Sequence, residues 1–470
     1  MKTKISAKTG HFIDDQVIAD VLAKSHAPDS SEVLEILAKA RELHGLSMAD
    51  VAILSLVTDP KLLEELFHTA RFVKESIYGR RMVLFAPLYI SNLCANECVY
   101  CAFRAKNSAI KRRALNQEEI AREVEILINQ GHKRILMVAG EAYPKQEGFQ
   151  YILDSIATIY NVKSGNGEIR RVNANLAPLS VEEFRLLREA KIGTFQIFQE
   201  TYHRPTYAQM HQAGIKRDFD WRVTGMDRAM EGGVDDVGIG ILFGLCDWRY
   251  EILAMLQHIA HLEDVFGVGP HTISVPRMEP ATGSSISINP PHPVNDDDFR
   301  KIVAIFRLAV PYTGIIMSTR ESAKMRAETF ALGVSQISAG SRTDPGGYST
   351  EEDPMDSSQF SLGDHRHIDE VVLDLVRMGY IPSFCTGCYR LGRTGADFMD
   401  MAKPGLIKAH CDPNGISTFM EYLLDYASPQ TRKEGLALVD KVLPTMPPLA
   451  RERAEKLAAL VKAGKRDVYC

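Results

Sequence analysis

The stretch that decides the fold is residues 83–103, VLFAPLYISNLCANECVYCAF. It opens with an apolar run rich in branched and aromatic side chains, which is typical of a buried strand in a parallel sheet. Three cysteines follow with the spacing Cx3Cx2C, namely Cys94, Cys98 and Cys101. The sequence therefore predicts a buried strand whose carboxyl end leads into a loop that carries three thiols.

Further apolar runs follow this first strand, separated by amphipathic segments of helical period. We expect strands at residues 83–90, 134–140, 169–176, 194–200, 236–244, 272–277, 314–318 and 335–340. The first intervening helix should start after Asn116 as its N-cap and stop at Gly131. Eight such units predict an α/β fold, a (β/α)8 barrel of TIM type over residues 81–345, with its active site at the carboxyl ends of the strands.

The two flanks of the barrel have different patterns. Residues 1–80 contain apolar stripes at helical spacing, which predicts an N-terminal helical extension on the outside of the barrel or across one mouth. A polar connection with glycines and prolines follows residue 345. Residues 346–470 are then expected to form a mostly helical C-terminal domain that carries the second group of cysteines.

Composition narrows the class of protein. The chain has 470 residues, 45% of them hydrophobic, and a net charge of −5. Its charges are mixed without a basic stripe, so we expect no nucleic acid and no membrane surface as partner. We see no apolar run of the roughly 20 residues that cross a bilayer and no core of a signal peptide, which predicts a cytoplasmic protein. In such a compartment, clustered cysteines indicate metal ligation rather than disulfides.

The first cysteine group predicts an iron–sulfur cluster. Three thiolates can hold three irons of a cubane and leave the fourth iron open for chemistry. A zinc site is the alternative, but structural zinc usually takes four ligands, and no fourth cysteine or histidine is near in sequence. The spacing favours a catalytic cluster.

With the aromatic Tyr100 before its last cysteine, this segment resembles the signature of the radical S-adenosylmethionine (SAM) superfamily. The resemblance implies a 4Fe–4S cluster whose open iron binds SAM and, when reduced, cleaves it to methionine and a 5′-deoxyadenosyl radical. Gly140 and Glu141 in AGEAY are similar to the family's Gly-Gly-Glu motif and would contact SAM, although Ala139 replaces the first glycine. Glu200, at the end of a strand, could bind the SAM ribose or be a structural carboxylate.

Two segments, FQIFQETYH (195–203) and ISVPR (273–277), resemble the aromatic amino acid lyases of this superfamily. The resemblance implies that L-tyrosine is cleaved between Cα and Cβ, giving p-cresol and dehydroglycine. A free amino acid needs a cation for its carboxylate, and arginine is the usual solution. We favour Arg320, with Ser318 beside it, over Arg277, and either arginine could instead form an ordinary surface ion pair.

The second cysteine group has the spacing Cx2Cx22C and consists of Cys385, Cys388 and Cys411. By spacing alone it is again a set of three thiolates with one open corner. The alternative is a zinc site completed by a histidine such as the neighbouring His410.

This spacing is similar to that of the tyrosine lyases that mature iron–iron hydrogenases, and the likeness covers essentially the whole chain. It implies an auxiliary 4Fe–4S cluster with an additional iron bridged by free cysteine. Dehydroglycine would be broken down there to carbon monoxide and cyanide, which leave on iron for other hydrogenase maturation proteins. An electron donor such as ferredoxin or flavodoxin would reduce the first cluster.

The resemblance also implies a histidine ligand for the additional iron. His271 precedes the sixth strand, so it would face the second group if the C-terminal domain docks at the lower mouth. His365 and His367 are rivals, and a histidine merely satisfied at a strand start is the alternative. Cys246 is expected in a barrel loop and Cys470 in a frayed terminus.

Two other functions remain open at this stage. One is a lyase that stops at dehydroglycine, as in thiamine synthesis, with a purely structural second cluster. The other is a scaffold protein that carries iron–sulfur clusters or zinc without catalysis.

Overall fold

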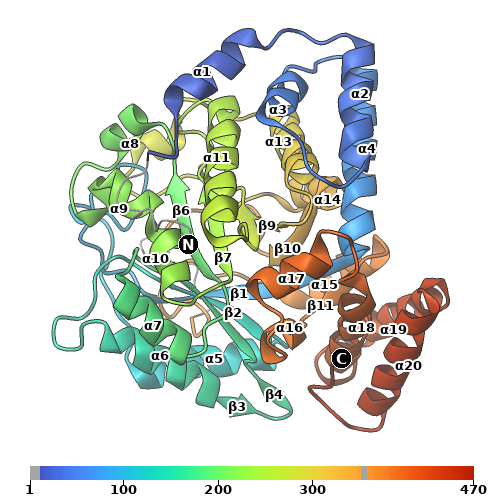
Figure 1. Cartoon of the computed structure of the whole chain (residues 1–470). Helices are drawn as coiled ribbons and strands as arrows, with labels where there is room; N and C mark the ends of the chain where they lie inside the picture. The colour runs from blue at the N-terminus through green and yellow to red at the C-terminus, as the bar shows by residue number, and fades with distance from the viewer. Residues whose placement is uncertain (1–10, 351–356) are drawn as a thin grey trace, which may run out of the picture.

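The computed structural model describes residues 11–350 and 357–470, and a closed barrel of parallel strands lies at its centre (Figure 1). The barrel strands are β1 (Arg81–Ser91), β2 (Arg134–Ala139), β5 (Arg171–Asn175), β6 (Phe195–Glu200), β7 (Val237–Ile241), β8 (Thr272–Ser274), β9 (Gly314–Met317) and β10 (Val334–Ser338). Each pairs in parallel with the next, and β10 closes the ring on β1. All eight expected strands and the (β/α)8 fold are confirmed.

Strand β1 is the longest strand of the barrel and takes part in three pairings. Its amino end, Arg81–Val83, pairs with β11 (Ile381–Ser383) from the C-terminal region. Val83–Phe85 pair with β10, and the rest of the strand pairs with β2. The strand is buried along nearly its whole length, as its unbroken apolar sequence predicted. The C-terminal region is thus joined to the amino end of the strand that carries the first cysteine loop at its other end.

Helices connect successive strands of the barrel. They are α5 (Gln117–Asn129), α6 (Gln150–Asn161), α7 (Val181–Glu189), α8 (Arg204–Met210), α9 (Phe219–Val223), α10 (Gly225–Glu231), α11 (Trp248–Phe266), α12 (Ser285–Ile288), α13 (Asp296–Ala309) and α14 (Ala323–Leu332). Helix α5 starts as predicted, because Asn116 and Glu119 form a capping box. Gly131 follows its end at φ +93°, a conformation that favours glycine. A small hairpin, β3 (Lys163–Ser164) and β4 (Gly167–Glu168), follows α6.

The N-terminal extension packs on the outside of the barrel. It consists of α1 (Asp15–Lys24), α2 (Ser30–Arg41), α3 (Met48–Ser55) and α4 (Pro60–Tyr78). Helix α4 lies against α13 and α14, while α1 and α3 lie against α11 (Figure 1). Acidic or hydroxyl side chains cap all four amino ends, as their sequence suggests. The extension therefore covers the barrel's outer helices.

The C-terminal region is mostly helical, as expected. It contains α15 (Ile368–Arg377), β11, α16 (Gly387–Arg390), α17 (Gly395–Ala402), α18 (Lys408–Asp425), α19 (Pro429–Val442) and α20 (Pro448–Lys462). Helix α18 is central, since it packs against β11, α19 and α20. Within the described ranges, no helix has the length and apolar character needed to cross a membrane.

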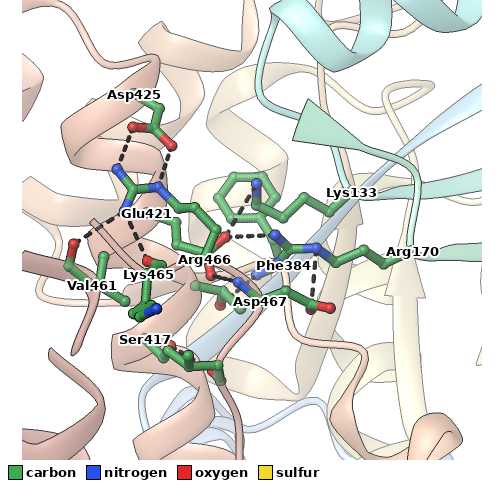
Figure 2. A network of polar contacts seen from close by, with 12 residues as sticks. Lys133, Arg170, Phe384, Ser417, Glu421, Asp425, Val461, Lys465, Arg466 and Asp467 are labelled. Atoms are coloured by element: carbon green, nitrogen blue, oxygen red, sulfur yellow. Dashed lines mark hydrogen bonds and ion pairs between the residues drawn. The ribbon is translucent and has the colours of Figure 1, made fainter. Parts of the chain in front are cut away.

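A buried network of charges ties α18 and the last residues of the chain to the barrel (Figure 2). The Glu421 carboxylate lies 2.9 Å from Nη2 of Arg170 and 3.3 Å from Nζ of Lys133. Nε of Arg170 is 3.2 Å from Oδ1 of Asp467, and the Asp467 amide donates to Glu421 at 2.6 Å. Glu421 is inaccessible to solvent, so its charge must be balanced inside the protein, and Lys133 and Arg170 are the cations in contact with it.

The expectation that Cys470 lies in a frayed terminus is wrong. The Asn414 side chain accepts from the Cys470 amide at 2.8 Å and donates to its carbonyl at 3.0 Å. Nη2 of Arg393 donates to the same carbonyl at 2.7 Å. The Asn414 side chain thus pairs with the amide and the carbonyl of Cys470, as a neighbouring strand would. Cys470 therefore has a fixed position.

We expect Glu421→Ala to destabilise the protein strongly, because it leaves Lys133 and Arg170 buried without their shared counter-charge. The loss should be about 3 to 5 kcal/mol, measured by urea unfolding. Glu434→Ala is the matched control, since Glu434 forms an exposed pair with Arg377, and it should change the midpoint little. Equal midpoints for the two variants would contradict the importance of the buried network.

Candidate functional site

A cavity opens at the carboxyl ends of the barrel strands, and we call it the upper cavity. Its wall contains every residue that the sequence analysis assigned to the first site, namely Cys94, Cys98, Cys101, Tyr100, Gly140, Glu141, Glu200, Ser318 and Arg320. They come from the ends of β1, β2, β6 and β9 and from the loops that follow. The convergence follows from closure of the barrel, because all eight carboxyl ends meet at one mouth.

The protein itself fixes the conformation of the cysteine loop. The amide of Val99 donates to the carbonyl of Met210 at 3.0 Å, which pairs the loop with the end of α8. The Arg112 guanidinium donates to the carbonyls of Asn92 and Phe103 at 2.9 and 2.8 Å. Three soft thiol donors on a rigid loop, open to a cavity on one side, fit a 4Fe–4S cluster with one free iron.

Position 140 requires a glycine because the end of β2 approaches the cysteine loop closely there. A Cβ atom at this position would lie 2.2 Å from the carbonyl oxygen of Leu93. The Gly140 amide also donates to the carbonyl of Ser91 at 2.9 Å. Whatever else it contacts, this glycine lets the end of β2 pack directly under the loop.

Glu141 is held by two polar partners. Nδ2 of Asn96, from the cysteine loop, donates to its carboxylate at 2.7 Å, and Nη1 of Arg222 does so at 2.7 Å. Burial alone would raise the pKa of Glu141, but Arg222 and Lys216 hold that pKa below its usual value. The carboxylate is therefore ionised and fixed beside the cluster loop.

Glu200 has a strained backbone at the end of β6. Its φ is +72°, which is uncommon for a residue with a side chain, and the pairing with β7 shifts register here. The strained turn points the carboxylate at Nζ of Lys216, 2.7 Å away. Glu200 therefore forms an internal ion pair with Lys216. Because it also lines the upper cavity, contact with a ligand stays a prediction.

Lys216 and Arg222 also line the upper cavity, and the sequence analysis missed both. They lie between β6 and β7, in stretches without a recognisable motif. Both side chains are almost completely buried, yet Glu141 and Glu200 are their only carboxylate partners among the described residues. The two buried cations are thus matched by two carboxylates, and all four groups line the cavity beside the thiols.

Tyr100 braces the cysteine loop from inside. Its hydroxyl lies 2.9 Å from Nε2 of His211, and the two rings meet edge to face. Burial raises the pKa of the Tyr100 hydroxyl well above its ordinary value, so it stays neutral.

The two candidate arginines differ in their partners. Arg277 is occupied, because its Nε lies 2.8 Å from Glu321 and its Nη1 lies 2.8 Å from Asp296. The guanidinium of Arg320 instead stacks 3.3 Å from the ring centre of Phe360. No carboxylate in residues 11–350 or 357–470 forms an ion pair with Arg320. Arg320 is thus the cation of the upper cavity with free hydrogen-bond donors.

Gln359 and Phe360 belong to the polar connection after the last strand, and the sequence analysis did not assign them to the site. Both line the upper cavity. Oε1 of Gln359 accepts from the Tyr89 hydroxyl at 2.7 Å, and its amide nitrogen lies 3.8 Å from Sγ of Cys101. Gln359 and Phe360 therefore close one side of the first site.

A second, smaller cavity lies at the opposite mouth, and we call it the lower cavity. Its volume is about 60 Å³, against about 180 Å³ for the upper cavity. Its wall contains Cys385, Cys388 and Cys411 together with His271, Arg81, Arg134, Asp236 and Tyr389. The structure therefore brings His271 and the second cysteine group together, as the docking of the C-terminal region at this mouth required.

His271 is the histidine that faces the second thiol group. Its Nδ1 lies 3.5 Å from Oδ1 of Asp236, and its ring packs 4.4 Å from Phe398. His410 turns away, because its Nδ1 lies 2.9 Å from Nη1 of Arg393. The described walls of the lower cavity include neither His410 nor His367, which caps α15.

The three thiols of the second group differ in acidity: burial raises the pKa of Cys385, and the hydrogen bond with Cys411 raises the pKa of Cys388. A hydrogen bond from Cys388 lowers the pKa of Cys411 to about 7. Arg81 is buried beside the three sulfurs, and their charges raise its own pKa against the effect of burial. The set of three thiols, a histidine and a buried cation fits an anionic iron–sulfur cluster with one corner open to the cavity.

Comparison with known proteins agrees with this arrangement. Residues 88–257 match the family model of the radical SAM superfamily, and residues 274–381 match the Biotin and Thiamin Synthesis associated domain. The 2-iminoacetate synthase of Escherichia coli (strain K12) is 32% identical over 332 residues, which cover 70% of this chain and 85% of the synthase. The fold and the first site thus define a radical SAM enzyme.

Solved structures identify a smaller group of radical SAM enzymes to which this chain is similar. A crystal structure of HydG, a maturase of the FeFe-hydrogenase, is 49% identical, with a TM-score of 0.94, over 98% of this chain and all of that one. HydG from Carboxydothermus hydrogenoformans is 39% identical, with a TM-score of 0.83, over 95% of this chain and 97% of that one. The chain belongs to the radical SAM group that contains HydG and the 2-iminoacetate synthases.

We expect Gly140→Ala to impair the first cluster selectively, because its methyl group would collide with Leu93 and displace the cysteine loop. After anaerobic reconstitution, the iron content should fall by about four atoms per chain. Gly225→Ala is the control, since a Cβ there meets its neighbours at 3.4 Å or more. Full iron content in Gly140→Ala would contradict this role.

Proposed function

We propose that this protein cleaves L-tyrosine to p-cresol and dehydroglycine at the upper cavity. It then breaks dehydroglycine down to carbon monoxide and cyanide at the lower cavity, as an iron-bound precursor for hydrogenase maturation. The observation that carries the proposal is that one barrel holds two separate three-cysteine sets, one at each mouth.

The likeness to HydG supports this function over that of a 2-iminoacetate synthase. The structural match extends over nearly the whole chain, whereas the match to the synthase covers 70% of it. The lower cavity depends on Cys385, Cys388 and Cys411, all from the C-terminal region. A purely structural second cluster would not need the free volume and the histidine beside these thiols.

In the upper cavity, Cys94, Cys98 and Cys101 would hold the cluster that binds SAM. Bound there, SAM and the reduced cluster supply the radical that starts cleavage. Glu141, while paired with Arg222, would contact the ammonium group of SAM, and Lys216, while paired with Glu200, would lie beside its carboxylate. Tyrosine would enter with its carboxylate toward Arg320, whose donors are free.

In the lower cavity, three thiolates and His271 would hold the auxiliary 4Fe–4S cluster and its additional iron, bridged by free cysteine. Asp236 lies near Nδ1 of His271 and can fix which ring nitrogen carries the proton. Arg81 balances the negative charge of the thiolates. Electrons would come from a donor such as ferredoxin or flavodoxin, and the product would pass to other hydrogenase maturation proteins.

The reconstituted protein should convert tyrosine, in the presence of SAM and a reductant, to p-cresol together with carbon monoxide and cyanide. Cresol is measured by chromatography and carbon monoxide by trapping on haemoglobin. Cresol without carbon monoxide or cyanide would instead establish a lyase that stops at dehydroglycine. Absence of all three products would rule out the proposed function.

Cys388→Ser tests whether the two sites have separate tasks. We expect cresol formation to persist and carbon monoxide to fall at least tenfold, because only the lower site loses a ligand. Cys246→Ser is the control, since this buried loop cysteine lines neither cavity in the described structure. It should leave both products unchanged, and unchanged carbon monoxide in Cys388→Ser would contradict the division of tasks.

His271→Ala should remove the additional iron and leave cleavage of SAM intact. The readout is the electron paramagnetic resonance spectrum of the second cluster, together with iron content. His410→Ala is the matched control, because His410 is adjacent to Cys411 in sequence but bonds to Arg393. An identical spectrum for His271→Ala and the unchanged protein would exclude His271 as a ligand.

A further inference from the structure

One acidic side chain in the upper cavity has no role in the function proposed above. Glu279 follows the end of β8 and is half-buried in the cavity wall. Two residues earlier, Arg277 directs its guanidinium to Glu321 and Asp296 instead. Among the described residues, none forms a hydrogen bond or ion pair with the Glu279 carboxylate. A carboxylate left without a partner in a cavity wall is available to a ligand.

The charges that face Glu279 affect its protonation. Burial and the neighbouring Glu321 raise the pKa of Glu279 to about 7, although Arg320 and Arg277 oppose the shift. Near neutral pH the group is therefore present both as carboxylate and as acid. It can accept a proton from a bound ligand or return one without a large cost.

Glu279 and Arg320 lie near enough to influence each other's charge, and both line the upper cavity. Arg320 comes from the loop after β9, and Glu279 comes from the loop after the adjacent strand β8. The ammonium and carboxylate groups of an α-amino acid are attached to one carbon. Their receptors must therefore be neighbours, one anionic and one cationic, as these two side chains are.

We propose that Glu279 binds the α-ammonium group of the substrate and takes a proton from it, while Arg320 binds the α-carboxylate. This inference rests on the proposed function, since it assumes an amino acid in the upper cavity. The step is a proton transfer without oxidation or reduction: the ammonium becomes a neutral amine and the Glu279 carboxylate becomes a carboxylic acid. Loss of a hydrogen atom from the neutral amine gives a neutral nitrogen radical, whereas loss from the ammonium would leave a radical cation.

The phenol of tyrosine is the other group that Glu279 could serve. The phenol lies at the far end of the side chain from the α-carbon. With the carboxylate of tyrosine on Arg320, a side chain beside Arg320 would therefore be closer to the amine than to the phenol. The two possibilities predict different binding patterns, because a ligand can keep the phenol and lack the amine.

The test is calorimetric binding of two ligands to the anaerobic holoenzyme with SAM. One ligand is L-tyrosine, and the other is 3-(4-hydroxyphenyl)propionate, which has the same carboxylate and phenol but no amine. We expect Glu279→Gln to weaken tyrosine binding by about ten- to a hundredfold, the value of one charged hydrogen bond, and to leave the propionate unaffected. Arg320→Gln is the control and should weaken both ligands alike.

Other results would overturn the inference. If Glu279→Gln weakens both ligands equally, the residue serves the phenol or the shape of the site. If it weakens neither, the carboxylate does not contact the substrate. If the unchanged protein binds no tyrosine and forms no cresol, both the proposed function and the inference fail. If the unchanged protein binds tyrosine and forms cresol, but Glu279→Gln does not weaken tyrosine binding selectively, only the inference is rejected.

Discussion

The two sites of this protein depend on a single strand. The carboxyl end of β1 leads into the loop with Cys94, Cys98 and Cys101, and its amino end pairs with β11, two residues before Cys385. At about 3.3 Å per residue, this eleven-residue strand spans roughly 33 Å. The strand therefore holds the two thiol groups at opposite mouths of one barrel. The interior of the barrel lies between the two groups.

Several of the buried charges at the mouths of the barrel form ion pairs with local partners. At the upper mouth, Glu141 and Glu200 balance Lys216 and Arg222. Such pairs contribute little net stability, because desolvation offsets most of their attraction. These ion pairs fix the positions of the side chains. Removal of one partner leaves the other as an unpaired buried charge, so any other arrangement of the site costs free energy.

Much of the fold could be predicted because its signals are local. Short runs of sequence predict the strand at 83–90 and the capped helix after Asn116. The Cx3Cx2C spacing places three candidate ligands within eight residues. The missed residues have no such signal. Lys216 resembles an ordinary basic residue until the backbone strain at Glu200 aims a carboxylate at it, and the ordered position of Cys470 depends on Asn414, 56 residues earlier. These contacts exist only in the folded chain.

The separation in sequence between the ligands also orders the assembly of the protein. The first thiol group lies on one short loop, so its three sulfurs can meet as soon as that loop has formed. The second group joins α18 to a turn after β11, and the lower cavity also needs the amino ends of β7 to β9 around His271. Contacts between segments so distant in sequence form late, after loop-closure entropy has been overcome. The lower site is therefore completed only when the barrel has closed and α18 has docked.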